Sequence, residues 1–219
     1  MNVAIDGPSG AGKSSVSKAV ARANGFIHID TGAMYRALAY NALQSSVDVS
    51  DINEIKKMLD NTTLEIKLED NDQKVFINNE DVTGKIRTEQ VSMMASKISK
   101  IPMVREFLLD MQRSLARENN VVMDGRDIGT VVLPNAELKI FLTASAEKRA
   151  ERRYKELLEK NEKVEYNIVL RDVIQRDKQD TERETAPLKA AADSVILDTS
   201  SMSFEESVEA INKLIKERM

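Results

Sequence analysis

The chain contains no cysteine, no tryptophan and a single histidine among its 219 residues. Without cysteine, disulfides, iron–sulfur clusters and thiolate zinc sites are excluded, and one histidine excludes a histidine-rich metal site. Aromatic residues make up only 4% of the chain, so the core must be mainly aliphatic. The absence of cysteine favours a reducing compartment, and we expect a cytoplasmic protein.

Long apolar runs and an excess of positive charge are also missing. No apolar run approaches the roughly 20 residues that a membrane-spanning helix needs, and we expect neither a membrane span nor a secretory signal. Lys and Arg together number 32 against 36 for Asp and Glu, which gives a net charge of −4. A protein whose main partner is a nucleic acid polymer usually has a basic excess. We therefore expect no such partner, and any anion must bind at a local cluster of cations.

The first thirty residues alternate between strand and helix patterns. Val3-Ala4-Ile5-Asp6 reads as a buried strand that Gly7-Pro8 terminates. Apolar residues at helical spacing predict a helix from Lys13 to Asn24, with Gly25 in the position of a C-terminal cap. Phe26-Ile27-His28-Ile29-Asp30 follows as a second strand. A strand, a helix and a strand within about 30 residues form a βαβ unit, which predicts a parallel sheet.

Three further strands are predicted at residues 121–124, 138–142 and 194–198. Helical segments separate them, as an α/β sheet requires. A final helix is predicted from a capping box of Ser203 and Glu206. Its apolar face would carry Phe204, Val208, Ile211 and Ile215.

One segment departs from this alternation. Residues 63–68 alternate with period two, and residues 74–77 follow after the turn-like Asp70-Asn71-Asp72. This pattern predicts a half-exposed antiparallel hairpin, which residues 80–83 extend. We expect an inserted lobe at about residues 62–99.

A phosphate-binding loop follows the first strand. Gly7-Pro8-Ser9-Gly10-Ala11-Gly12-Lys13-Ser14 matches G-x-x-x-x-G-K-[ST] at every position. In such a loop backbone N–H groups surround phosphate oxygens at a helix N-terminus, the lysine reaches the β and γ phosphates, and the hydroxyl ligates Mg²⁺. The residues expected to bind ATP are Gly7, Pro8, Ser9, Gly10, Ala11, Gly12, Lys13, Ser14 and Ser15.

The rest of the chain narrows the class of nucleotide-using protein. A guanine-reading N-K-x-D is missing, because Asn212-Lys213-Leu214-Ile215 lacks the aspartate. His28 lies within a strand, where a packed histidine is more common than a catalytic base, so no Ser-His-Asp arrangement is available. These absences favour a small-molecule kinase.

Charged residues follow the carboxyl ends of the predicted strands, where ligands bind in parallel α/β sheets. Arg36 comes after the second strand and offers a planar fork for a phosphate. Asp124-Gly125-Arg126-Asp127 ends the third strand and suits a metal, a phosphate and a base edge. The alternative is a turn with solvated charges.

Two groups of arginines lie further along the chain. Arg149, Arg152 and Arg153 share one predicted helix face, which either closes over phosphates or is solvated. Arg176, Asp180 and Arg183 come after a further predicted helix, before Ala186-Pro187-Leu188. Arginines gathered at one cleft would neutralise a transferring phosphoryl group.

Taken together, residues 7–14, 30–36, 124–132, Arg183 and residues 186–188 resemble the bacterial cytidylate kinase family. The resemblance runs from end to end and includes the hairpin insert. It implies an α/β fold of the P-loop type: a five-stranded parallel sheet flanked by helices, an inserted antiparallel β lobe and an arginine-bearing lid. Residues 1–219 would form one domain with a core (about 1–36, 118–148 and 186–219), a monophosphate-binding lobe (about 37–117) and a lid (about 149–170).

The same resemblance implies transfer of the γ-phosphoryl group of ATP to CMP or dCMP with Mg²⁺, by a monomer. The implied contacts of CMP are Thr31, Arg36, Arg126 and Arg183 to its phosphate, Ser96, Arg105 and Asp127 to cytosine, and Arg176 and Asp180 to the sugar. The implied catalytic residues are Lys13, Arg126, Arg149 and Arg153, and the implied metal ligands are Ser14 and Asp124.

Two other functions use the same loop. One is a kinase for a different small acceptor, such as another nucleoside monophosphate or a shikimate-like compound. The other is a nucleotide-binding module that does not consume ATP. The hairpin insert and residues 124–127 argue against the first.

Overall fold

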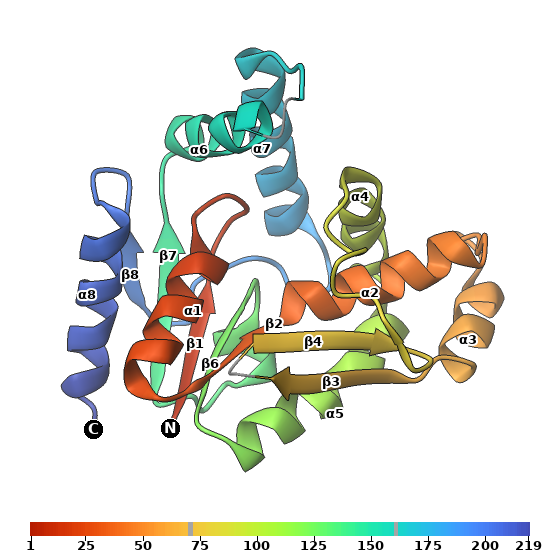
Figure 1. The fold of residues 1–219 in the computed structure, drawn as a ribbon, viewed down its shortest axis with the longest axis horizontal. Helices are drawn as coiled ribbons and strands as arrows, with labels where there is room; N and C mark the ends of the chain where they lie inside the picture. Colours follow the sequence, from red (N-terminus) through yellow and green to blue (C-terminus); the bar gives the residue numbers. More distant parts are fainter. Residues whose placement is uncertain (70–71, 160–161) are drawn as a thin grey trace. The chain divides into compact units, whose positions relative to one another are not determined.

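The computed structural model describes residues 1–69, 72–159 and 162–219 (Figure 1). The chain forms two compact units, one of residues 1–26 and 122–219 and the other of residues 27–121. Within the described residues, no helix combines the length and the apolar composition needed to cross a membrane. The predicted division into core, lobe and lid stays a prediction, and residues 160–161 of the predicted lid lie outside the described residues.

The main sheet has five strands in the order β2-β6-β1-β7-β8. Its strands are β1 (Asn2–Asp6), β2 (Ile27–Asp30), β6 (Val121–Gly125), β7 (Leu138–Thr143) and β8 (Val195–Asp198). β7 pairs in parallel with β1 and with β8. Four of the short apolar runs became largely buried strands of a parallel α/β sheet, while β8 at its edge alternates between half-buried and exposed residues. This sheet confirms the predicted fold class.

In the first unit, helix α1 (Lys13–Asn24) packs against α8 (Phe204–Lys216). Gly25 ends α1 in the left-handed region, at φ 66°, and Ser203 and Glu206 form the predicted capping box of α8. Ile211 and Ile215 of α8 are fully buried in the core. Phe204 is a correction, because 48% of it is exposed and it is not among the side chains that pack on this core.

The first unit also contains α6 (Ala146–Glu159) and α7 (Tyr166–Glu182), which pack against each other. Their shared core holds Ala150, Leu157, Val169 and Val173. A short π-helical turn, η1 (Ile128–Val132), follows β6.

Within the described residues, the second unit contains β2, four helices and a small sheet. Its helices are α2 (Thr31–Gln44), α3 (Ile52–Asp60), α4 (Glu89–Ile98) and α5 (Pro102–Glu118). The side chains of Asp30, Asp51 and Thr88 cap α2, α3 and α4, and Pro102 stands in the first turn of α5. Each helix therefore begins where a capping residue or a proline favours a start.

The small sheet confirms the predicted hairpin. β3 (Leu64–Glu69), β4 (Asp72–Ile77) and β5 (Glu80–Asp81) pair in that order, and both pairings are antiparallel. Leu64 lies opposite Ile77, and both side chains are buried. Asp70 and Asn71 of the predicted turn lie outside the described residues.

Candidate active site

The loop between β1 and α1 has the backbone of a phosphate cradle. Gly7 has φ 150°, and a Cβ at this position would lie 1.9 Å from the carbonyl oxygen of Leu142. Gly12 directly precedes α1 with φ 87°. A side chain at Gly7 is excluded by the lack of space, and one at Gly12 would be strained by its backbone conformation. The glycines of the motif therefore allow the tight loop in front of the helix N-terminus, where phosphates bind.

Lys13 is buried at the start of α1, and its Nζ donates a hydrogen bond to the carbonyl oxygen of Pro8, 2.7 Å away. Burial is the main reason that its pKa lies well below the usual value, and the positive charge of Arg126 lowers it further. Asp124, Asp6 and Asp180 act in the opposite direction. Lys13 thus shares one electrostatic environment with the residues at the end of β6.

Ser14 and Asp124 lie together, as the metal prediction requires. The Ser14 hydroxyl donates to Oδ2 of Asp124 over 2.9 Å, and Asp124 is buried at the end of β6. A hydroxyl and a carboxylate are hard oxygen ligands of the kind Mg²⁺ accepts alongside water and phosphate oxygens. The described residues hold no group of three or more His, Cys, Asp or Glu placed to bind a metal. The donor set therefore fits a metal that arrives with a nucleotide.

Asp180 lies close to three arginines of the first unit, Arg126, Arg176 and Arg183. Arg126 Nε donates to Oδ2 of Asp180 over 2.8 Å. Burial raises the pKa of Asp180, but Arg126, Arg176 and Arg183 outweigh it, so the pKa lies below its usual value. The carboxylate is therefore ionised at neutral pH and can hold these guanidinium groups.

Arg183 connects this group to Asp127. Its guanidinium lies 3.6 Å from Oδ1 of Asp127, and both side chains are buried. Its Nε donates to the carbonyl oxygen of Ala186 over 2.6 Å. Ala186 has a positive φ of 49°, although it precedes a proline. A backbone conformation that is rare for alanine thus aims a carbonyl at Arg183.

Two of these residues, Arg176 and Asp180, lie at positions that differ from the sequence prediction. Arg176 and Asp180 lie within α7, one turn apart, and not after a helix. The helix runs to Glu182, beyond the end that the sequence predicts. Arg183 directly follows its last residue.

The three predicted lid arginines have different surroundings. Arg149 is buried, forms a two-pronged ion pair with Asp177 at 2.5 and 2.9 Å, and donates to the carbonyl oxygen of Ser9 in the loop. Arg152 donates to the carbonyl oxygen of Thr199 over 2.9 Å. Arg153 is an exposed partner of Glu156. Arg149 and Arg152 thus donate to carbonyl oxygens of the phosphate loop, at Ser9 and Ala11, while Arg153 faces solvent. Their assignment to a lid stays a prediction.

In the second unit, Asp30 holds Arg36. Oδ1 of Asp30 caps α2 by accepting the amide of Ala33, and Oδ2 accepts from Arg36 over 2.8 Å. Burial raises the pKa of Asp30, but Arg36, His28 and the Ala33 amide together bring it below the usual value. Nε of Arg36 is buried and has no hydrogen-bond partner within the described part of the chain. One donor of this guanidinium is therefore left for an anion.

The remaining predicted contacts also belong to the second unit. Thr31 is buried at the first position of α2, and Ser96 is partly buried in α4. Arg105 of α5 lies over the Tyr35 ring at 5.6 Å and donates to the carbonyl oxygen of Ser99. The ring and the carbonyl fix the direction of a guanidinium that would otherwise be mobile.

Two residues that support the site by hydrogen bonds to its backbone, Gln73 and Asp6, were not predicted from the sequence. Gln73 of β4 accepts the amide of Asp30 over 2.7 Å and donates back to its carbonyl oxygen over 3.3 Å. Asp6 accepts two backbone amides from η1. Neither residue belongs to a recognisable motif, although the place of Asp6 at the end of β1 is a signal that could have drawn attention to it.

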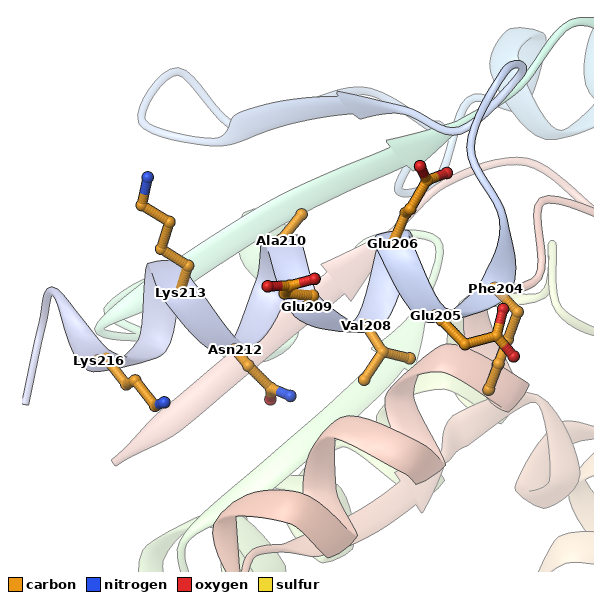
Figure 2. Close-up of a pocket in the computed structure, with 9 residues that line it drawn as sticks. All are labelled: Phe204, Glu205, Glu206, Val208, Glu209, Ala210, Asn212, Lys213 and Lys216. Atoms are coloured by element: carbon orange, nitrogen blue, oxygen red, sulfur yellow. The ribbon is translucent and has the colours of Figure 1, made fainter.

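A surface groove lies elsewhere. Its volume is about 760 Å³. Its lining side chains all come from α8, as Figure 2 shows. It is lined by Phe204, Glu205, Glu206, Val208, Glu209, Ala210, Asn212, Lys213 and Lys216. No predicted site residue is among them, so it is not the candidate active site.

Comparison with known proteins identifies the family. The cytidylate kinase family model matches residues 3–217. A cytidylate kinase of Caldicellulosiruptor bescii is 52% identical over 98% of this chain and 95% of its own length. The enzyme of Caldicellulosiruptor saccharolyticus is 50% identical with the same coverage. A crystal structure of an uncharacterised Eubacterium ventriosum protein has a TM-score of 0.56 at 12% identity, covering 100% of this chain and 99% of that one, and shows the fold alone. The chain belongs to the cytidylate kinase family.

Proposed function

We propose that the protein transfers the γ-phosphoryl group of ATP to CMP or dCMP, giving ADP and CDP or dCDP. The observation that carries this proposal is the 52% identity to a cytidylate kinase over nearly the full length of both chains. The intact phosphate loop and the paired arginines support the same reaction. The cytoplasmic location and the monomeric state stay predictions.

The donor nucleotide is assigned to residues 7–15. Backbone amides of the loop and the N-terminus of α1 bind the phosphates, and Lys13 stabilises the charge that develops on the transferring group. Ser14 and Asp124, 2.9 Å apart, would hold the metal. A bound Mg²⁺ would neutralise part of the charge on the β and γ phosphates.

The acceptor phosphate is assigned to Thr31, Arg36, Arg126 and Arg183. Arg36 has a donor to spare, and Asp30 keeps its guanidinium in place. Arg126 is oriented in the same way by Asp180. A carboxylate behind each arginine fixes the planar fork before the substrate arrives, which limits the entropy lost on binding.

The cytosine base is assigned to Ser96, Arg105 and Asp127, and the sugar to Arg176 and Asp180. Cytosine presents an amino donor beside two acceptors, so a carboxylate and a guanidinium form the required complement. A base that leaves one of these buried groups unpaired is rejected more strongly than one of poor shape.

The chemistry needs no dedicated general base. An oxygen of the CMP phosphate is already anionic and attacks the γ phosphorus in line with the departing ADP oxygen. The bond to ADP breaks as the bond to the acceptor forms, and ADP leaves with the electron pair. Positioning and neutralisation by Lys13 and Arg126 then supply the catalysis, with Arg149 and Arg153 assigned to the lid.

A coupled assay of ADP release, with and without CMP, tests this proposal. We expect release to be slow with ATP alone and to rise at least a hundredfold on addition of CMP. A nucleotide-binding module would bind ATP and show no stimulation by any acceptor. Stimulation by shikimate and not by CMP would instead assign the enzyme to another acceptor.

A further inference from the structure

Asp6 occupies the junction between β1 and the phosphate loop, but no role follows from the loop motif. It is the last residue of β1, only 4% of it is exposed, and Gly7 follows directly. Its carboxylate accepts two hydrogen bonds from η1. Oδ1 accepts the amide of Ile128, and Oδ2 accepts the amide of Gly129, each over 2.7 Å. The two donors are more than 120 residues away in the sequence.

Those two amides are the first two of the η1 turn, and a helical turn leaves its first amides without internal partners. The residue just before such a turn usually supplies the capping group. Here that residue is Asp127, and its side chain forms no capping hydrogen bond to η1. Its carboxylate lies 3.6 Å from Arg183 instead. Asp6 therefore caps η1 in place of Asp127.

Close packing at Gly129 supports this arrangement. A Cβ at Gly129 would lie 3.4 Å from Oδ2 of Asp6 and 3.2 Å from Cδ of Lys139. The Lys139 Nζ is itself held by the Pro134 carbonyl oxygen and by the Asp193 carboxylate. The Asp6 carboxylate and a fixed lysine stem therefore both pack against the start of η1. A shift of Gly129 toward them would meet one or the other.

We infer that Asp6 is a positioning residue for the acceptor nucleotide, holding η1 so that Asp127 and Arg126 keep their substrate-binding geometry. Asp127 directly precedes the two bonded amides, and Arg126 precedes Asp127. Any movement of η1 therefore moves both. The inference rests on the proposed function, because CMP is the ligand that these two residues would bind.

The effect of Asp6→Asn follows from the chemistry of the amide. Its oxygen still accepts one backbone N–H, but its NH₂ group opposes the second. We expect the KM for CMP to rise about tenfold while the KM for ATP changes less than twofold, since the loop retains its own backbone. A change of one buried hydrogen bond corresponds to a factor of this size.

Two further variants complete the test. Gly129→Ala leaves the Asp6 side chain unchanged but places a Cβ 3.2 Å from Cδ of Lys139 and 3.4 Å from Oδ2 of Asp6, which would displace the turn. We expect the same selective rise in the KM for CMP. Asp48→Asn is the matched control, because Asp48 also accepts two donors, the amide and hydroxyl of Ser50, on the exposed surface of the other unit. It should leave both KM values unchanged.

The decisive experiment combines steady-state kinetics with amide hydrogen exchange. In Asp6→Asn without nucleotide, we expect the amide hydrogens of Ile128 and Gly129 to exchange faster than in the wild-type protein. This measurement tests the cap independently of whether the wild-type protein uses CMP. Failure of the wild-type protein to use CMP would overturn the proposed function and leave that measurement valid. Unchanged exchange, equal rises in both KM values, or a lower melting temperature with unchanged KM values would each overturn the inference.

Discussion

The two units hold their arginines differently. In the first unit, Arg126 and Arg149 are fastened by carboxylates and by backbone carbonyls, and Arg149 is 4% exposed. In the second unit, the Arg36 side chain is 22% exposed, and its Nε has no hydrogen-bond partner among the described residues. Arg105 lies on the face of an aromatic ring. The first unit carries preorganised charge, so a lost residue there should affect catalysis or folding. The second unit also holds its arginines in place but leaves a donor of Arg36 for a ligand, so the loss of Arg36 should affect acceptor binding.

The largest expected effect is at Lys13, in the first unit. Lys13→Ala removes the buried cation beside the phosphate loop, and we expect kcat to fall about a thousandfold. Steady-state kinetics with saturating ATP and CMP measure this loss. Lys18→Ala, further along the same helix, is the control and should retain the wild-type kcat. A kcat within tenfold of wild type for Lys13→Ala would show that the charge of the first unit is not catalytic.

The second effect is a pH dependence of stability, also in the first unit. Burial raises the pKa of Asp6 to about 6, although the amides of Gly129 and Ile128 oppose the rise. The folded protein therefore binds the proton more tightly than the unfolded chain. Protonated Asp6 stabilises the fold fully below about pH 4, and this contribution is lost as the pH rises through 6.

The free energy of unfolding, measured by urea titration between pH 4 and 7.5, checks this effect against Asp6→Asn. Relative to that variant, the wild-type protein should lose about 3 kcal/mol over this range, because each unit of pKa shift corresponds to about 1.4 kcal/mol. If the free energy of unfolding varied with pH in the same way for both proteins, Asp6 would have an ordinary pKa.

The third effect belongs to the second unit. Arg36→Ala should raise the KM for CMP about thirtyfold, because a charge-assisted hydrogen bond to phosphate is lost. The KM for ATP should stay within twofold. Lys85→Ala, which breaks an exposed ion pair with Glu80 in the same unit, is the matched control and should change neither constant. Near-normal turnover of CMP by Arg36→Ala would remove Arg36 from the phosphate site.

The smallest effect concerns the hairpin insert. Gln73→Ala removes both hydrogen bonds to the backbone of Asp30, which in turn orients Arg36. We expect a rise of about fivefold in the KM for CMP, consistent with about 1 kcal/mol for a hydrogen bond. Lys67→Ala in the neighbouring strand serves as control. If both variants behave alike, Gln73 does not link the insert to Arg36.

Patterns in the sequence correctly predicted the features that depend on residues close together in the chain. The phosphate loop, the Gly25 cap and the Ser203 capping box all depend on residues within a few positions of one another, and the structure has each of them. The alternation of residues 63–68 likewise became β3. The roles assigned to individual site residues stay predictions.

The other side-chain contacts of the site join residues that are distant in the sequence, which local patterns cannot show. Arg149 looks like one of three arginines on a helix face, and only the fold brings it to Asp177 and to Ser9. Asp6 meets η1 across more than 120 residues. Nothing near Asp180 in the sequence shows that Arg126 will lie against it. The exposed Phe204 is the reverse case, since periodicity cannot show which position on an apolar helix face stays exposed.

The most direct test of the proposed function is a comparison of acceptors. The kcat/KM for CMP, dCMP, UMP and AMP should be measured at saturating ATP with one preparation of the wild-type protein. We expect CMP and dCMP to exceed UMP and AMP by at least a hundredfold, because we propose that Asp127, Arg105 and Ser96 bind cytosine, whose donors and acceptors differ from those of uracil and adenine. Comparable values for all four acceptors would contradict the account.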